Sequence, residues 1–80
     1  MEEKLGNIIT ALQELMQDNT VPKNVRGKVE TIIAALKEDA EVSMRVDKAL
    51  QELDGISDDN NLQAYTRTQV WNIVSMLETI

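Results

Sequence analysis

Apolar residues recur every three or four positions in four separate segments of the sequence. The first segment, roughly 2–18, places them on one face of a helix: Leu5, Ile8, Ile9, Leu12, Leu15 and Met16. Similar stripes run from Pro22 to near Lys37, over 42–56, and through the C-terminal segment up to Ile80. Since spacings of three and four mark one face of an α-helix, the pattern predicts four amphipathic helices joined by short connections.

Polar residues between the stripes predict where the helices begin. Pro22 suits the first turn of the second helix, because it lacks the N–H that a helix start leaves unpaired. Asp39 or Ser43 would cap the third helix through a side-chain oxygen. Asn60 or Asn61 would cap the fourth helix in the same way. The sequence therefore predicts an all-α fold.

The two halves of the chain match when one is shifted by 41 residues, the separation between Asp18 and Asp59. Apolar positions can coincide through the helical period alone, but that period does not explain matched polar residues. The further polar matches are Asn19 with Asn60 and Arg26 with Arg67. A period near 40 residues with two helices per repeat falls in the range of HEAT and armadillo repeats. We therefore predict one domain, 1–80, with internal repeats at about 2–38 and 43–80.

Each predicted repeat has an Asp-Asn loop followed by an Arg early in its second helix. This order is similar to that of HEAT hairpins, in which an Asp and a Val-Arg pair, here Val25-Arg26, flank the turn. We interpret Asp18 with Arg26, and Asp59 with Arg67, as structural turn pairs in which the guanidinium reaches the loop carboxylate or loop carbonyls. A ligand site between the repeats is the alternative, but a structural device is what recurs with each structural unit. We expect two HEAT-like helical hairpins packed into a small bundle, with an open solenoid left as the other arrangement.

Composition and charge narrow the range of functions. The 80 residues contain no Cys and no His, which removes thiolate ligands, the commonest zinc ligand and the usual acid–base side chain. The net charge of −6 disfavours direct binding to nucleic-acid phosphates. The N-terminal residues lack a signal-peptide pattern, and no apolar stretch approaches the ~20 residues that span a bilayer. We expect a cytoplasmic protein that binds no metal, cofactor or membrane.

No residues in the sequence suggest catalysis. There is no nucleophile with a matched base, no Gly-rich phosphate loop and no metal-ligand cluster. The sequence therefore predicts a protein that is not an enzyme.

The C-terminal helix carries the predicted partner surface. On a helical wheel Trp71 lies about 100° from Val70, at the edge of the apolar stripe and one turn after Arg67. Trp and Arg are enriched at interface hot spots, and the equivalent position in the first repeat is Glu30, so the repeat does not require an aromatic there. The alternative is a Trp that covers the rim of the core with Arg67 stacked on it. The predicted surface comprises Trp71, Tyr65, Met76, Ile80 and Arg67.

A local basic cluster supports a different class of function. Lys23, Arg26 and Lys28 lie together at the start of the second helix. They would suit an accessory factor on a ribonucleoprotein such as the ribosome, although a solvated helix end is the simpler interpretation in an acidic chain without interleaved aromatics.

Two segments carry a resemblance to a known family. Residues 18–26 read DNTVPKNVR, and residues 66–72 read TRTQVWN. Together they resemble the archaeal uncharacterised protein family 0147, short HEAT-like helical proteins of unknown function. The resemblance implies an archaeal, all-helical, cytoplasmic protein and no particular activity. The leading hypothesis is a protein–protein interaction module that self-associates, for example as a homodimer, or docks on a larger assembly.

Overall fold

The computed structural model describes residues 2–80 and contains four α-helices over that range. They are α1 (Glu2–Gln17), α2 (Lys23–Leu36), α3 (Val42–Ser57) and α4 (Ala64–Glu78). The predicted all-α fold is confirmed, and the predicted helices agree with these bounds to within a few residues. The predicted domain spans 1–80, and its residue 1 lies outside the described residues.

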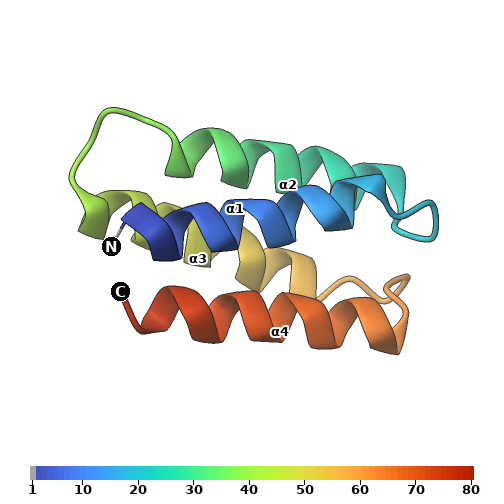
Figure 1. Ribbon diagram of the computed structural model, residues 1–80. Coiled ribbons are helices and arrows are strands. Elements are labelled where there is room, and N and C mark those ends of the chain that lie inside the picture. The colour runs from blue at the N-terminus through green and yellow to red at the C-terminus, as the bar shows by residue number, and fades with distance from the viewer. Residues whose placement is uncertain (1) are drawn as a thin grey trace.

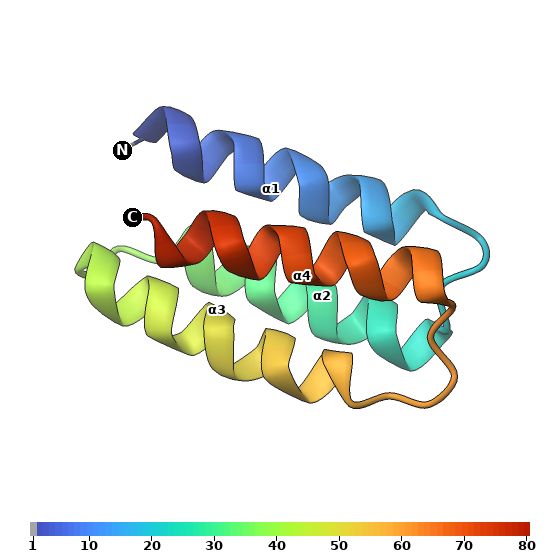
Figure 2. The same ribbon diagram turned by 90° about the horizontal axis from the view of Figure 1, so that it is seen from below.

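The helices form a closed antiparallel ring. Each helix packs against the next one in sequence, and α4 also packs against α1 (Figure 1). In the view from below, α4 lies in front of α2, and α1 and α3 lie on opposite sides of this pair (Figure 2). Both termini lie at one end, and the α1–α2 and α3–α4 turns lie at the other (Figures 1 and 2). The arrangement is therefore a closed four-helix bundle rather than an open stack of hairpins.

One aliphatic core fills the ring. Positions that are 41 residues apart in the sequence are buried in both halves, so each half contributes an equivalent set of core side chains. The buried equivalent pairs are Leu5 and Val46, Ile8 and Ala49, Leu12 and Leu53, Leu15 and Ile56, Val21 and Leu62, Val29 and Val70, Ile32 and Ile73, and Leu36 and Leu77. At one further equivalent pair, Val25 is matched by Thr66, the one buried polar residue among residues 3–80.

The predicted helix caps are wrong. The N-cap residues of the second, third and fourth helices are Pro22, Glu41 and Gln63, and none of them makes a side-chain capping hydrogen bond. The side chain of Asp59, which precedes the predicted caps of α4, instead accepts a hydrogen bond from the backbone N–H of Asn61 at 2.8 Å. Asx-type bonds of this kind hold the turn itself, and the helix begins a few residues later.

Gly27 offers a test of helix energetics on the solvent face of α2. It is exposed, and a Cβ built there has no atom within 4 Å. Because glycine in a helix interior is disfavoured relative to alanine, we expect Gly27→Ala to raise the free energy of unfolding by about 0.5–1 kcal/mol. Urea denaturation measures this, and Ala34→Gly, also exposed on α2, should lower stability by a similar amount. Destabilisation by Gly27→Ala would contradict the open surroundings of this position.

Candidate functional site

The second hairpin turn is held by one aspartate and one arginine. Arg67 Nη2 donates a hydrogen bond to the Asp59 carbonyl oxygen at 3.1 Å, in a partly buried setting. The backbone N–H of Leu62 donates to the same carbonyl oxygen at 3.3 Å. The Arg67 guanidinium thus spans the turn and fixes the start of α4 against the end of α3.

The first hairpin turn has the same backbone path but a different arginine geometry. Asp18 Oδ1 accepts hydrogen bonds from the Thr20 hydroxyl at 2.7 Å and from the Thr20 backbone N–H at 2.9 Å. These two bonds, the hydroxyl first, hold the pKa of the Asp18 carboxyl below its usual range. Within residues 2–80, Arg26 makes no hydrogen bond to Asp18, and its buried Nε has no partner.

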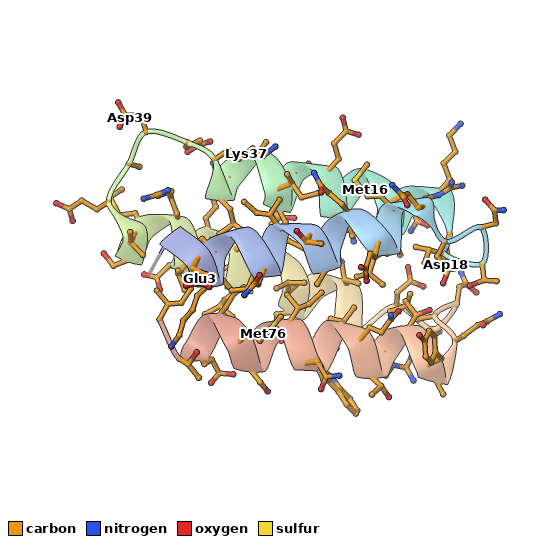
Figure 3. All side chains as sticks on the ribbon, viewed as in Figure 1. Glu3, Met16, Asp18, Lys37, Asp39 and Met76 are labelled. Carbon is orange, nitrogen blue, oxygen red and sulfur yellow. The ribbon has the colours of Figure 1, made fainter. Side chains whose placement is uncertain are left out.

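The two hairpin turns meet at one end of the bundle. Asn24 Nδ2, in the first turn of α2, donates to Asp59 Oδ2 at 3.2 Å across a sequence separation of 35 residues. Figure 3 shows Asp18 at this end of the molecule. Asp59 therefore uses one carboxylate oxygen for its own turn and the other for the neighbouring hairpin. Sequence reasoning missed Asn24, because nothing local marks a partner so far along the chain.

A third arginine, also missed from the sequence, joins α3 to α2. Arg45 Nη1 donates to the Leu36 carbonyl oxygen at 3.1 Å, in a partly buried setting. Leu36 is the last residue of α2, where carbonyl groups lack intrahelical donors. Arg45 therefore satisfies a helix end through a tertiary contact, and its place early in α3, four residues after the N-cap Glu41, was the only available signal.

Both aromatic residues of the chain lie exposed on α4. Tyr65 is 67% exposed and Trp71 is 56% exposed, and the sequence contains one Tyr, one Trp and no Phe. Scattered exposed apolar side chains are ordinary on protein surfaces. Here, however, the two largest apolar side chains available to a small protein are left out of its core and placed on the same helix.

The structure divides the five predicted partner-surface residues among different flanks of α4. At about 100° per residue, Trp71 lies about 40° from Arg67 but about 140° from Met76. Tyr65 lies within about 20° of Met76 on the same wheel. Met76 points toward α1 and lines a hollow with Lys4, Asn7, Ile8 and Thr79 (Figure 3). Ile80, beyond the end of α4, lies beside the start of α3 in a hollow with Val42, Ser43, Val46 and Asp47.

The basic cluster at the start of α2 is also divided. Lys23 and Lys28 are exposed and lie about 140° apart on the helix, while Arg26 is half-buried. Lys23 and Arg26 line a shallow hollow together with the acidic residue Glu30. The three cations therefore do not form one continuous basic face.

The described residues contain no large enclosed chamber among the hollows near α4. The hollow between α1 and α4 has a volume of about 190 Å³, and the more open one beside Ile80 has about 320 Å³. In the part of the chain from residue 2 onward, no group of three or more acidic side chains is arranged to hold a metal ion. In the same part, no helix is both long and apolar enough to cross a membrane.

The fold places the chain among small all-α, four-helix proteins, and comparison identifies the family. The model of the "Uncharacterised protein family (UPF0147)" matches residues 1–80. The chain belongs to this family, and the similar proteins of the family described below come from archaea.

Individual relatives match along nearly their whole length. The chain is 44% identical over 80 residues to UPF0147 protein MJ1419 of Methanocaldococcus jannaschii, covering 99% of this chain and 86% of that protein. It is 38% identical over 82 residues to UPF0147 protein PF0239 of Pyrococcus furiosus, covering 100% of this chain and 88% of that protein. It also matches the crystal structure of the unknown-function protein MMP1188 with a TM-score of 0.94 and 46% identity, covering 99% of this chain and 91% of that one.

Proposed function

We propose that this protein is a non-catalytic, cytoplasmic protein–protein interaction module that uses the exposed face of α4. The observation that carries the proposal is the exposure of both aromatic residues, Tyr65 and Trp71, on that helix. Aromatic anchors supply a large share of binding energy at protein interfaces. Aromatic side chains that stay more than half exposed contribute less to folding stability than they would inside the core, so a role outside the fold is the better explanation.

The HEAT-like character of each hairpin is part of the same proposal. An Asp-Asn turn followed by an arginine early in the next helix supports it in both halves, and Arg67 bonds to the turn in the second. Because the four helices form a closed ring, the two hairpins would act as a single rigid unit rather than as stacked repeats of a curved solenoid. A rigid unit presents α4 to a partner with little ordering cost on binding.

The alternative is an accessory factor held on a ribonucleoprotein by Lys23, Arg26 and Lys28. The separation of these side chains around α2 weakens this alternative, since phosphate contacts gain from a continuous basic face. Nuclease treatment separates the two functions experimentally.

The test is recovery of the tagged protein from its native host with and without nuclease, followed by quantitative mass spectrometry. We expect a defined protein partner, or untagged copies of the same chain, to persist after nuclease and to fall at least tenfold with Trp71→Ala. Met44→Ala is the matched control, because Met44 is 63% exposed but lies on α3. Equal recovery with all variants, or loss of every protein with nuclease, would contradict the proposal.

A further inference from the structure

One stripe of α4 has charged residues at its ends and apolar residues at its centre. Four residues at spacings of four, three and four fall within about 60° of one another on the helix. Trp71 and Glu78 are exposed, while Arg67 and Val74 are half-buried. This stripe, called the Trp71 stripe below, comprises Arg67, Trp71, Val74 and Glu78.

The Trp71 stripe is complementary to itself in the antiparallel direction. A two-fold axis that crosses α4 between Asn72 and Ile73 places each residue opposite a defined residue of a second copy. Trp71 then faces the Val74 position of the other copy, and Arg67 faces the Glu78 position. Two-fold dimers are built from such isologous contacts, in which each pairing occurs twice. A parallel pairing would instead place like charges together at both ends of the stripe.

The other flank of α4, which includes the half-buried Gln69 and Met76, does not have this pattern. Its residues are Tyr65, Gln69, Asn72 and Met76, none of which carries a formal charge at neutral pH. Charge complementarity sets register and partner choice at interfaces, and on α4 only the Trp71 stripe offers charges of both signs. The partner that it fits is another copy of this chain.

The geometry next to the stripe allows a helix to dock there. Leu50 of α3 and Val74 of α4 are half-buried side chains that pack on the edge of the core, and α3 and α4 pack against each other. A second α4 would therefore find apolar surface on two helices. One N–H of the Arg67 guanidinium bonds to Asp59, and a guanidinium has five N–H groups in total, so a carboxylate can be bound as well.

The size of the surface predicts a weak dimer. The 15 residues of α4 span about 22 Å. A stable interface buries about 600 Å² or more per partner, roughly an eighth of the 4999 Å² total surface of the chain. A single helix pair with part of α3 is at the low end of this range, so we expect the dimer to dissociate on dilution.

We propose that the Trp71 stripe is the interface of an antiparallel homodimer, in which Trp71 packs against the Val74 position and Arg67 pairs with the Glu78 position of a second copy. This inference rests on the proposed function and specifies its partner. The dimer has two identical charge pairs at its ends and two tryptophans near its axis.

Charge reversal with mixing tests the pairing. Sedimentation equilibrium should show that Glu78→Arg and Arg67→Glu each dimerise at least tenfold more weakly than the unsubstituted protein, because like charges then meet twice. A one-to-one mixture of the two variants should recover an affinity within a few fold of the original, since opposite charges meet again. Glu14→Arg, an exposed reversal on α1, should leave dimerisation unchanged.

Arg67 also bonds to the turn, so a substitution there can change folding as well as dimerisation. A second variant at Trp71 avoids this problem. Trp71→Ala removes a mostly exposed side chain and should weaken the dimer at least tenfold while leaving the urea midpoint of the monomer nearly unchanged. A protein that stays monomeric at millimolar concentration, or a dimer unaffected by Trp71→Ala and Glu78→Arg, would overturn the homodimer. Recovery of a different protein that depends on Trp71 would then still support the proposed function, whereas recovery that ignores Trp71 and Tyr65 would remove both.

Discussion

Leu12→Ala and Leu53→Ala each lower the free energy of unfolding by about 2–5 kcal/mol, as expected for a leucine truncated inside a close-packed core. Both side chains have 0% exposure, and they occupy equivalent positions in the two halves of the bundle. The total stability of an 80-residue domain is only about 4–12 kcal/mol. Either substitution therefore removes a large share of the stability, and urea denaturation followed by circular dichroism measures it.

The matched controls lie on the same helices. Ile9 on α1 and Leu50 on α3 are another equivalent pair, half-buried against the core. Their replacement by alanine should cost roughly half as much as the fully buried leucines, because less apolar area leaves water on folding. A loss below about 1 kcal/mol for Leu12→Ala or Leu53→Ala would show that the two halves do not share one tightly packed core.

Thr66→Val raises the free energy of unfolding by about 1–3 kcal/mol. Thr66 is 1% exposed, and within the described part of the chain its Oγ1 has no hydrogen-bond partner. Burial of an unpaired hydroxyl costs free energy, while valine has nearly the same shape and no polar atom. Thermal or urea denaturation gives the difference directly.

The reverse substitution, Val25→Thr, can be made at the equivalent position in the first half of the chain. Val25 occupies the position equivalent to Thr66 and is 1% exposed. Val25→Thr should destabilise the protein by a similar amount, because it introduces the same unpaired hydroxyl. If Thr66→Val lowers stability instead, the hydroxyl must make a stabilising hydrogen bond.

Helical periodicity accounts for most of what could be predicted about the fold. Stripes such as Leu5 to Leu15 identify a helix and its buried face, because burial and a period of 3.6 residues are linked by geometry. The caps could not be predicted, because Asp18 and Asp59 bond within the turns and leave Pro22 and Gln63 to begin the helices. Closure of the ring was left open, since a repeat pattern does not specify whether hairpins stack or wrap around a common core.

Fewer contacts of the site than of the fold could be predicted, because several of them join residues that are far apart in the sequence. Arg67 was assigned to its turn because its partner Asp59 is eight residues away, and the two bond as expected. Asn24 and Arg45 act between elements and have no local signature. The partner surface was predicted from residue type and from the place of Trp71 on the helical wheel, but Met76 was grouped with Trp71 although the two lie about 140° apart on the helix.

Polar contacts near both ends of the bundle hold its helices together. At one end, Asp59 joins both hairpin turns through Asn61 and Asn24. Near the other end, Arg45 ties α3 to the last residue of α2. These contacts join the helices around an aliphatic core that contains neither Tyr65 nor Trp71.

The emission of the single tryptophan, measured as a function of protein concentration together with sedimentation, tests the proposed interface most directly. Because Trp71 is the one Trp of the sequence and is 56% exposed in the isolated chain, its emission reports on the proposed surface alone. Dimerisation through the Trp71 stripe should shift the emission to shorter wavelength along the monomer–dimer transition, as Trp71 leaves water. Association with no change in the emission of Trp71 would contradict it, because the contact would then lie elsewhere on the molecule.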